Sequence, residues 1–289
     1  MKTLAIAALL ACSAKAQQQP DIPELLDALG RSAAIFARSV PGLAAQETLR
    51  QKGRRGNMQI LKKGRKEQLK NVAFTIPDEF QTHEVISNYS FGVAGGASGF
   101  HEIRKVVTID KAPVPVANLR HSLTLGATSA DDETKKMLLE DLEQTQLQGS
   151  VVDFGPMLLL FTKQKQFDFE FRSGGRKDTI PEAVFVLNYR QLSGSNAVTE
   201  FRDRSETKHP LSGQIWLRES DLIPTRITVR TEEILTTKYT LSNEAEIDYQ
   251  PTPYGLAPAM VVHRQYLNQD LLVENQFRYT DYHGRPFVP

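Results

Sequence analysis

The chain has 289 residues, of which 40% are hydrophobic and 24% are charged, and its formal net charge is +1. This composition is that of an ordinary globular protein, and the length suits one large domain or two small ones. A net charge so close to zero argues against bulk electrostatic binding of nucleic acid, so we expect no nucleic-acid partner.

The first 16 residues have the features of an export signal. Lys2 provides a positive start, residues 3–11 form a short apolar core, and Ala14-Lys15-Ala16 precedes a polar run that begins at Gln17. The apolar core is too short to span a bilayer, and no later segment is long and apolar enough to do so. We therefore expect a signal peptide over 1–16 and a mature chain in the periplasm or outside the cell, without a transmembrane segment.

Cys12 is the only cysteine, and it follows Leu9, Leu10 and Ala11 in a stretch similar to a bacterial lipobox. Two alternatives remain open. Cys12 carries a lipid that anchors the protein to the outer membrane, or it is a small apolar residue of a cleaved signal. In both cases the mature chain forms no internal disulfide, so its core must hold the fold together.

A helix is predicted first, over about 21–40. Leu25, Leu29 and Phe36 recur at helical spacing, Asp21 is a capping residue, and a Pro-Gly pair ends the pattern. The apolar period then changes to two, which predicts strands at about 44–55, 57–63, 67–75, 82–92 and 100–109.

The middle of the chain is predicted to be helical. Ser129 is in the N-cap position of a helix whose first turn carries acidic residues at 131–133. A shorter helix is predicted over 156–161. Together these segments predict a helical insertion over about 129–162.

Strands are predicted again from residue 166. Phe167, Phe169 and Phe171 alternate with acidic residues, which predicts that all three share one face of a strand. Residues 183–189 are apolar in both phases, so we expect that strand to be covered on both sides.

A β-hairpin is predicted from the stretch SGQIWLRESDLIPTRITV. Apolar residues alternate with polar ones on both sides of a turn that ends at Pro224, which predicts paired strands at 213–218 and 225–235. Trp216 lies in the phase opposite to the apolar residues. It is either a half-exposed residue packed on a neighbouring strand or an anchor at the rim of a ligand or membrane site.

Three final strands are predicted at about 237–249, 258–267 and 271–281. About ten or eleven antiparallel strands are expected to offer an apolar face. A sheet this wide must twist and curl into a barrel or half-barrel. Its apolar face then forms a concave interior, which is filled either by the chain's own side chains or by an apolar guest. The residues predicted to line it are Ile215, Leu217, Ile227, Val229, Tyr239, Leu241, Ile247, Phe277 and Tyr279.

The residue patterns that usually bind phosphate, metal or a catalytic partner are weak in this sequence. The glycine-rich stretch FGVAGGASGF lacks phosphate-loop spacing and is expected to be a hairpin loop. His83 and His101 are expected at surface or rim positions, and the alternative is that a hairpin brings them together. Glu232-Glu233 is an adjacent pair whose side chains point apart in a strand. We expect no metal site, no cofactor and no catalytic residue.

One stretch, residues 49–70, is strongly basic. It either contacts anionic headgroups or protects the edge of a hairpin from pairing with other chains. The candidates for contact with an anionic surface are Arg54, Arg55, Lys62, Lys63, Arg65 and Lys66.

Three stretches resemble the bacterial outer-membrane lipoprotein-sorting superfamily of LolA/LolB-like proteins. They are YSFG with GFHEIRKVVTID within 89–110, GQIWLRESDLIPTRITV over 213–229, and ENQFRYTDYHGRPF over 274–287. The resemblance implies a mainly β (α+β) fold: a large curled antiparallel sheet that forms an unclosed β-barrel with a few covering helices, here over a single domain of residues 17–289. It implies binding of acyl chains or other lipids, and it carries over no catalytic residue.

The sequence therefore predicts a non-enzymatic, exported protein of the cell envelope that binds a lipid or another apolar ligand in a concave interior. The alternative is a structural or protein-interaction module whose barrel is filled by its own side chains and whose partners are other envelope proteins.

Overall fold

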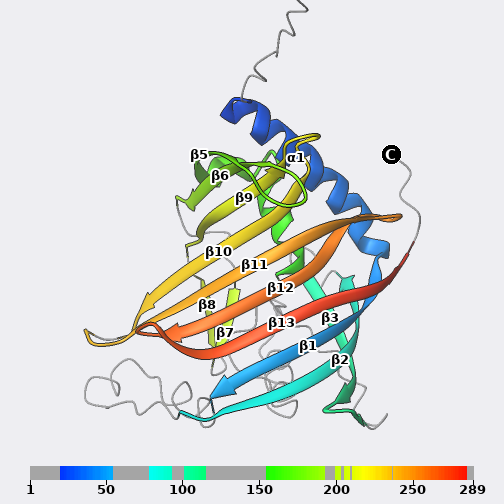
Figure 1. The fold of residues 1–289 in the computed structure, drawn as a ribbon, viewed down its shortest axis with the longest axis vertical. Coiled ribbons are helices and arrows are strands. Elements are labelled where there is room, and N and C mark those ends of the chain that lie inside the picture. Colours follow the sequence, from blue (N-terminus) through cyan, green and yellow to red (C-terminus); the bar gives the residue numbers. More distant parts are fainter. Residues whose placement is uncertain are drawn as a thin grey trace, which may run out of the picture.

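The computed structural model describes residues 20–54, 78–92, 101–114, 154–192, 199–202, 205–208, 210–235 and 237–284. Within them, eleven strands form one antiparallel sheet in the order β4-β3-β2-β1-β13-β12-β11-β10-β9-β6-β5, and two more form a separate hairpin (Figure 1). The strands are β1 Ala44–Arg54, β2 Phe80–Gly92, β3 His101–Ile109, β4 Ala112–Pro113, β5 Phe169–Lys177, β6 Val184–Gln191, β7 Thr199–Arg202, β8 Ser205–Lys208, β9 Ser212–Arg218, β10 Pro224–Ile234, β11 Thr240–Thr252, β12 Gly255–Leu267 and β13 Asp270–His283.

The sheet curls but does not close, because its edge strands β4 and β5 do not pair with each other in the described part of the chain. The first strand lies in the interior of the sheet: β1 pairs with β2 on one side and with the last strand, β13, on the other. The first and the last strand of this sheet in chain order therefore lie side by side. The predicted fold class, an unclosed curled antiparallel sheet with helical cover, is confirmed.

The predicted N-terminal helix is present as α1 Ile22–Ser39. The Asp21 side chain accepts a hydrogen bond from the backbone N–H of Glu24 (2.8 Å), which satisfies one of the free donors of the first turn. The apolar stripe of α1 is buried against the rest of the molecule, and its largest members are Leu25, Leu29 and Phe36. A short 3₁₀ helix, η1 Val40–Gly42, then leads into β1.

The predicted hairpin is also present, because β9 and β10 pair antiparallel with Ile227 opposite Ile215. Its turn is closed by the Arg218 guanidinium, which donates to the Asp221 carboxylate, and by Leu222 in the left-handed region (φ 58°). On the outer face, the Trp216 indole is half-buried and lies between the cations of Lys177 and Arg226, 5.0 and 5.1 Å from its ring. Trp216 thus has the position of a half-exposed sheet residue.

The prediction for Phe167 is wrong. Residues 166–168 form a 3₁₀ turn, η5 Gln166–Asp168, and the Phe167 side chain is 85% exposed. The Gln166 amide donates to the carbonyls of Leu26 and Phe161, which holds this segment against α1. The strand therefore begins only after residue 168. The alternation begins only at Phe169, whose ring packs on Phe161.

On β6, the next strand, both faces are buried at residues 184–187, as predicted. The predicted short helix is a 3₁₀ helix, η4 Gly155–Phe161. Several other predictions lie outside the described residues: the signal with Cys12, the strands at 57–63 and 67–75, the helix from Ser129, and most of the glycine-rich stretch. The basic candidates Arg55, Lys62, Lys63, Arg65 and Lys66 also lie outside them.

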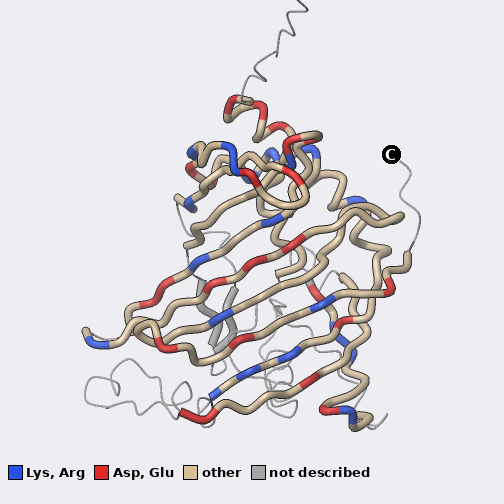
Figure 2. Tube along the Cα trace, viewed as in Figure 1, with Lys and Arg blue, Asp and Glu red and all other residues tan. Residues whose placement is uncertain are grey.

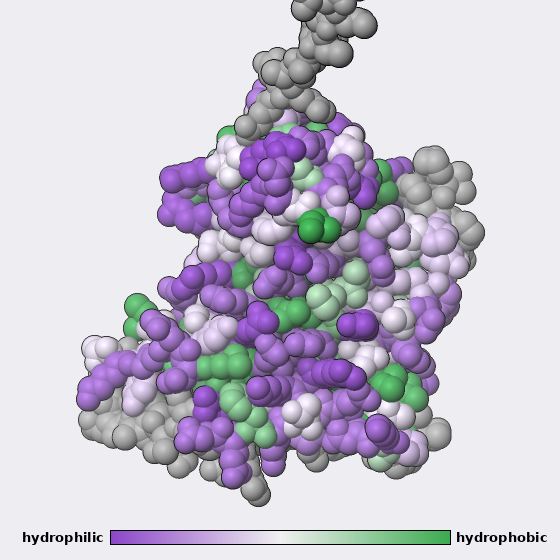
Figure 3. Space-filling model, in the orientation of Figure 1, coloured by the Kyte–Doolittle hydropathy of each residue, from purple (hydrophilic) through white to green (hydrophobic). Residues whose placement is uncertain are grey.

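The outer face of the sheet is polar and carries both signs of charge. Figure 2 shows acidic and basic residues on the strands from β10 to β13, and Figure 3 shows this face as largely hydrophilic. Arg226 donates to Asp248 on the next strand, and Arg264 donates to Glu274. Exposed pairs of this kind contribute little stability, so the fold depends mainly on its concave face.

Candidate functional site

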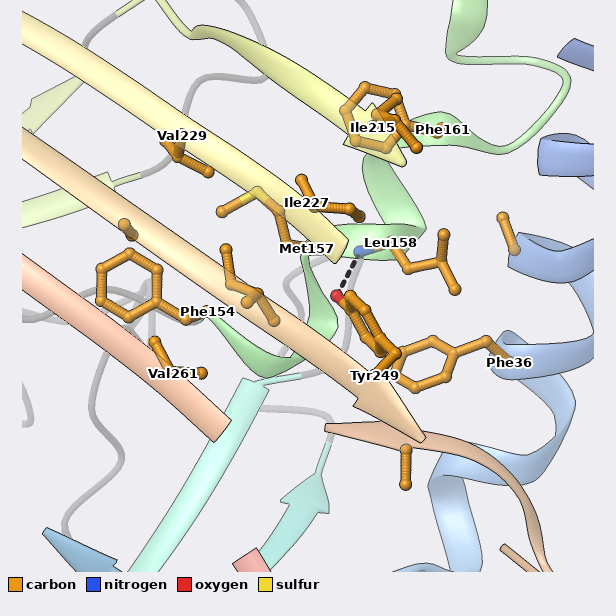
Figure 4. Packing of buried hydrophobic residues seen from close by; sticks show 14 of the residues in the cluster. Phe36, Phe154, Met157, Leu158, Phe161, Ile215, Ile227, Val229, Tyr249 and Val261 are labelled. Carbon is orange, nitrogen blue, oxygen red and sulfur yellow. Dashed lines mark hydrogen bonds between the residues drawn. The ribbon is translucent and has the colours of Figure 1, made fainter. Parts of the chain in front are cut away.

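The concave face of the sheet carries the main apolar cluster. Seven of the nine predicted interior residues belong to it: Ile215, Leu217, Ile227, Val229, Ile247, Phe277 and Tyr279. Figure 4 shows the strands that carry Ile215, Ile227 and Val229 packing against η4. The η4 residues Met157, Leu158 and Phe161 point toward the sheet. The Tyr249 hydroxyl accepts a hydrogen bond from the Leu158 backbone N–H (3.2 Å) and so attaches η4 to β11.

The other two predicted residues, Leu241 and Tyr239, lie in a second cluster nearer the β10–β11 turn. Leu241 is fully buried there with Leu267, Leu272 and Val273, and Tyr239 is partly buried against them. The concave face therefore differs from the single continuous apolar surface that the alternation predicted.

A polar band separates the two apolar clusters. We use this name for Gln51, Asn243, His263, Gln265 and Asn275, which come from four neighbouring strands, β1, β13, β12 and β11. The Gln51 amide donates to Asn275 (2.7 Å), the Asn275 amide contacts the His263 ring (3.3 Å), and His263 contacts the Asn243 carbonyl oxygen (3.1 Å). Sequence reasoning missed this band, although each member stands between two inward apolar positions of its strand or next to one.

A buried charged triad lies on the same face, formed by Glu47, Glu102 and Arg104. The Arg104 Nε lies 2.7 and 2.8 Å from the two carboxylate oxygens of Glu47, and its Nη2 lies 3.2 Å from Glu102 Oε2. The three side chains are 3% exposed or less. Two carboxylates against one guanidinium give the ionised triad a net charge of −1.

Glu102 connects this triad to the cover of the sheet. Its carboxylate accepts hydrogen bonds from the backbone N–H groups of Phe154 (3.1 Å) and Gly155 (3.0 Å), at the start of η4, and from the Tyr89 hydroxyl (2.7 Å). Charge-assisted bonds of this kind are stronger than neutral ones. Glu102 therefore fixes η4 to β3, whereas α1 is held mainly by its apolar stripe.

The triad perturbs the pKa values of its members. Burial raises the pKa of Glu47 above its ordinary value, and the attraction of Arg104 only partly offsets this. Burial acts to lower the pKa of Arg104, but the carboxylates of Glu102 and Glu47 outweigh it and the pKa is raised well above the ordinary value. Burial also raises the pKa of the nearby Tyr89 and Tyr279 hydroxyls, so both are neutral at physiological pH.

We expect Glu47→Gln to change the pH dependence of stability. Because the folded pKa of Glu47 is raised, its stabilising contribution is complete below the ordinary pKa of 4.5 and is lost as the pH rises through the folded value. Glutamine does not titrate. The stability difference, variant minus wild type, should therefore move in favour of the variant above pH 4.5, by about 1.4 kcal/mol per unit of pKa shift.

Urea unfolding of the wild type and of Glu47→Gln between about pH 4 and 8 measures this difference. Glu84→Gln, on the outer face of β2 opposite Arg50, is the matched control for the chemical change. A difference for Glu47→Gln that stays constant across this range would contradict the assignment of a raised pKa to Glu47.

The remaining candidates do not form a site. His83 lies beyond one end of the β2–β3 pairing and His101 lies at the other end, opposite Gly92, so the hairpin does not bring the two histidines together. His83 instead bonds to the Asp110 carboxylate (2.7 Å), and this bond lowers the pKa of Asp110. Within the described residues, no group of three or more His, Cys, Asp or Glu side chains is arranged to hold a metal ion.

Arg54, the one described member of the basic candidate set, is occupied within the protein. Its Nε donates to the Leu271 carbonyl (2.7 Å), its guanidinium lies 4.6 Å from the Phe80 ring, and its side chain is 15% exposed. Glu232 and Glu233 are neighbours on β10, in opposite phases of the strand as predicted. No helix in the described part of the chain is long and apolar enough to cross a membrane.

Comparison with known proteins gives likenesses of structure only. No family model matches the chain, and no curated protein matches it. A DUF1329 family protein from Desulfovibrio piger is 7% identical with a TM-score of 0.36, over 91% of this chain and 95% of that one. A putative outer membrane lipoprotein-sorting protein domain from Vibrio parahaemolyticus is 8% identical with a TM-score of 0.36, over 90% and 95%.

A LolA superfamily protein from Nitrosomonas europaea is 9% identical with a TM-score of 0.33, over 89% of this chain and 94% of that one. Two of these three proteins, those from Vibrio parahaemolyticus and Nitrosomonas europaea, are of the lipoprotein-sorting or LolA type that the sequence resembles. The unclosed antiparallel sheet with its helical cover is the fold that the sequence resemblance implied.

Proposed function

We propose that this chain is a non-enzymatic, exported protein of the cell envelope that binds a lipid or another apolar ligand on the concave face of its sheet. In this proposal, residues 17–289 form one domain and α1 is the part of the cover that moves. The observation that carries the proposal is the way α1 is attached. An α-helix satisfies its own backbone hydrogen bonds, so α1 can leave the sheet without breaking the ladder.

The exchange of α1 for a ligand is close to balanced in free energy. Burial of Leu25, Leu29 and Phe36 contributes roughly 1.5–3 kcal/mol for each side chain, or about 5–9 kcal/mol together. An acyl chain contributes about 0.8 kcal/mol per buried methylene, so about ten methylenes supply a similar amount. A lipid of ordinary length can therefore compete with the helix.

Polar contacts of α1 also lie at its periphery. Lys163 Nζ lies 3.1 Å from Asp27 with both side chains exposed, and the Gln166 amide donates to the Leu26 carbonyl (2.9 Å). Both partners belong to the segment that joins η4 to β5. This segment is a natural place at which to fasten α1 by a cross-link.

A second candidate function has support in the same contacts. Phe36, Leu158 and Phe161 are fully buried, so the chain's own side chains fill this part of the interior. A protein-interaction module with a permanently filled interior and envelope proteins as partners would have the same core. The two functions differ in whether α1 moves.

The double variant Gly30→Cys with Lys163→Cys tests this movement, in a Cys12→Ser background. A Cβ placed on Gly30 would lie 3.7 Å from the Lys163 Cβ, close to the mean of about 3.8 Å in disulfides. The closest other atom, Gln166 Nε2 at 3.2 Å, is the end of a flexible side chain. The disulfide would therefore fasten α1 to the η4–β5 segment with little distortion.

We expect the reduced double variant to take up a pyrene-labelled fatty alcohol as the wild type does, and the oxidised form to lose most of this uptake. Each single-cysteine variant, treated with the same oxidant, is a control and should keep it. Equal uptake by the oxidised and reduced forms would show that α1 is not the moving part. Absence of uptake by the wild type itself would favour the filled interaction module.

A further inference from the structure

The polar band occupies the same level on four adjacent strands. Along β12, the inward positions run from Val261 in the main cluster through His263 and Gln265 to Leu267 in the second cluster. Along β13, Asn275 stands between Phe277 and Val273. The strand register aligns these levels, because Gln51 pairs with Asn275 and Asn275 pairs with His263.

On β11 the same order recurs, with Asn243 between Ala245 of the main cluster and Leu241 of the second. Asn243 is directly opposite Gln265 in the register. The band is therefore a transverse row across the concave face, with an apolar region on each side of it.

The hydrogen bonds of the band are consistent with neutral side chains throughout. The His263 ring receives the Asn275 amide at Nδ1, so the proton is on Nε2, which then donates to the Asn243 carbonyl. The Gln265 amide donates to the same carbonyl (3.2 Å). On β2 the row ends at His83, which is paired with Asp110, so the band offers amide and imidazole groups rather than an unpaired charge.

Stability alone does not account for such a band. His263, Gln265 and Gln51 are 1%, 0% and 1% exposed. Burial of polar groups costs free energy, and each neutral hydrogen bond contributes only about 0.5–1.5 kcal/mol to stability. Leucine or valine at these positions would serve a filled core at least as well.

We propose that the polar band is the subsite for a neutral hydrogen-bonding group of the bound lipid, such as a hydroxyl, an ester or an amide. The acyl part of the ligand lies on the main apolar cluster beside the band. This inference rests on the proposed lipid-binding function. The Phe154 ring, at the start of η4, covers His263 with 5.1 Å between ring centroids. In this proposal the Phe154 side chain turns aside when the ligand group binds, while the backbone of η4 stays on Glu102.

The band discriminates against charged headgroups. A carboxylate or phosphate would be buried without a cation among the five band residues to offset it, and the nearby triad already carries an excess negative charge. Burial of an uncompensated charge costs far more than burial of a hydroxyl or ester. A neutral lipid is therefore the favoured class, ahead of a fatty acid anion.

Three pyrene-labelled probes of equal chain length test the inference: an alkane, the corresponding alcohol, and the fatty acid at pH 8. We expect the wild type to bind the alcohol about tenfold more tightly than the alkane, which corresponds to one or two neutral hydrogen bonds. The anion should bind more weakly than the alcohol. Fluorescence titration gives the three dissociation constants.

The double variant His263→Leu with Asn275→Leu removes both partners of the central contact and leaves neither one unpaired. This double variant should bind the alkane at least as tightly as the wild type does. It should bind the alcohol no more tightly than the alkane. Gln276, the neighbour of Asn275, is exposed on the outer face of β13. Gln276→Leu is therefore the matched control and should keep the wild-type ratio of the dissociation constants for the alkane and the alcohol. If the double variant does not fold, Gln51→Leu, at the end of the row, is used in its place. It should lower the ratio of the alkane and alcohol dissociation constants at least threefold.

Two results would overturn the inference while leaving the proposed function intact. One is a wild type that binds the alkane and the alcohol equally. The other is a folded band variant that keeps the preference for the alcohol. A wild type that binds none of the three probes would instead remove the proposed function itself, and this inference with it.

Discussion

Replacement of Arg104 by methionine is expected to lower the free energy of unfolding by about 3–5 kcal/mol, because it leaves two buried carboxylates without their cation. Glu47 and Glu102 are 1% and 0% exposed, so water cannot replace the guanidinium. The Arg104 guanidinium also lies 5.5 and 5.1 Å from the rings of Tyr89 and Phe277, contacts that methionine only partly restores. Urea unfolding at pH 7 measures the loss.

Arg226→Met is the matched control. Arg226 also binds a carboxylate, that of Asp248, but it lies on the outer face and its side chain is 30% exposed. We expect Arg226→Met to lower the free energy of unfolding by at most about 1 kcal/mol. The loss of stability in Arg104→Met should also become smaller as the pH is lowered and Glu47, whose pKa is raised by burial, takes up a proton. Equal losses in the two variants would show that the triad is not the buried ionic centre described above.

The second large effect is expected at Leu241. This side chain is fully buried in the second apolar cluster, and its cross-strand neighbour on β10 is Glu233. Leu241→Ala should cost about 2–5 kcal/mol through lost contacts and the cavity that remains. Leu241→Glu should cost more than Leu241→Ala, because it buries a carboxylate next to an existing one.

Gln276→Glu places a new carboxylate on the opposite face of the sheet, across from Arg50 on β1. We expect its stability to remain within about 0.5 kcal/mol of the wild type. Thermal unfolding of the three variants in one buffer gives the comparison. An unchanged melting temperature for Leu241→Glu would mean that this face is in contact with solvent, and the apolar interior would have to be abandoned.

The sequence was sufficient to predict the elements with strong local patterns. The helix at 22–39 follows from its apolar stripe and its Asp21 cap, and the β9–β10 hairpin follows from period-two alternation around a turn. The wide, curled sheet follows from the number of such strands. Phe167 was misplaced because the pairing of Gln166 with Leu26 depends on α1, more than a hundred residues away.

The polar groups of the interior could not be predicted for a physical reason. On β1, Glu47 and Gln51 share a phase with Ala45 and Leu49, but the opposite phase is also polar, so the alternation does not show which face is buried. The partners that satisfy them, Arg104 and Asn275, come from β3 and β13. Only the strand order brings these residues together, and that order places the first strand beside the last.

The central claim is that the concave face accepts a lipid in place of α1. Native mass spectrometry of the protein, purified without detergent from the cells that make it, tests this claim most directly. The account predicts a population with the added mass of a neutral acyl lipid, which organic extraction then releases and identifies. A single species with the mass of the polypeptide alone, and an extract without lipid, would contradict it.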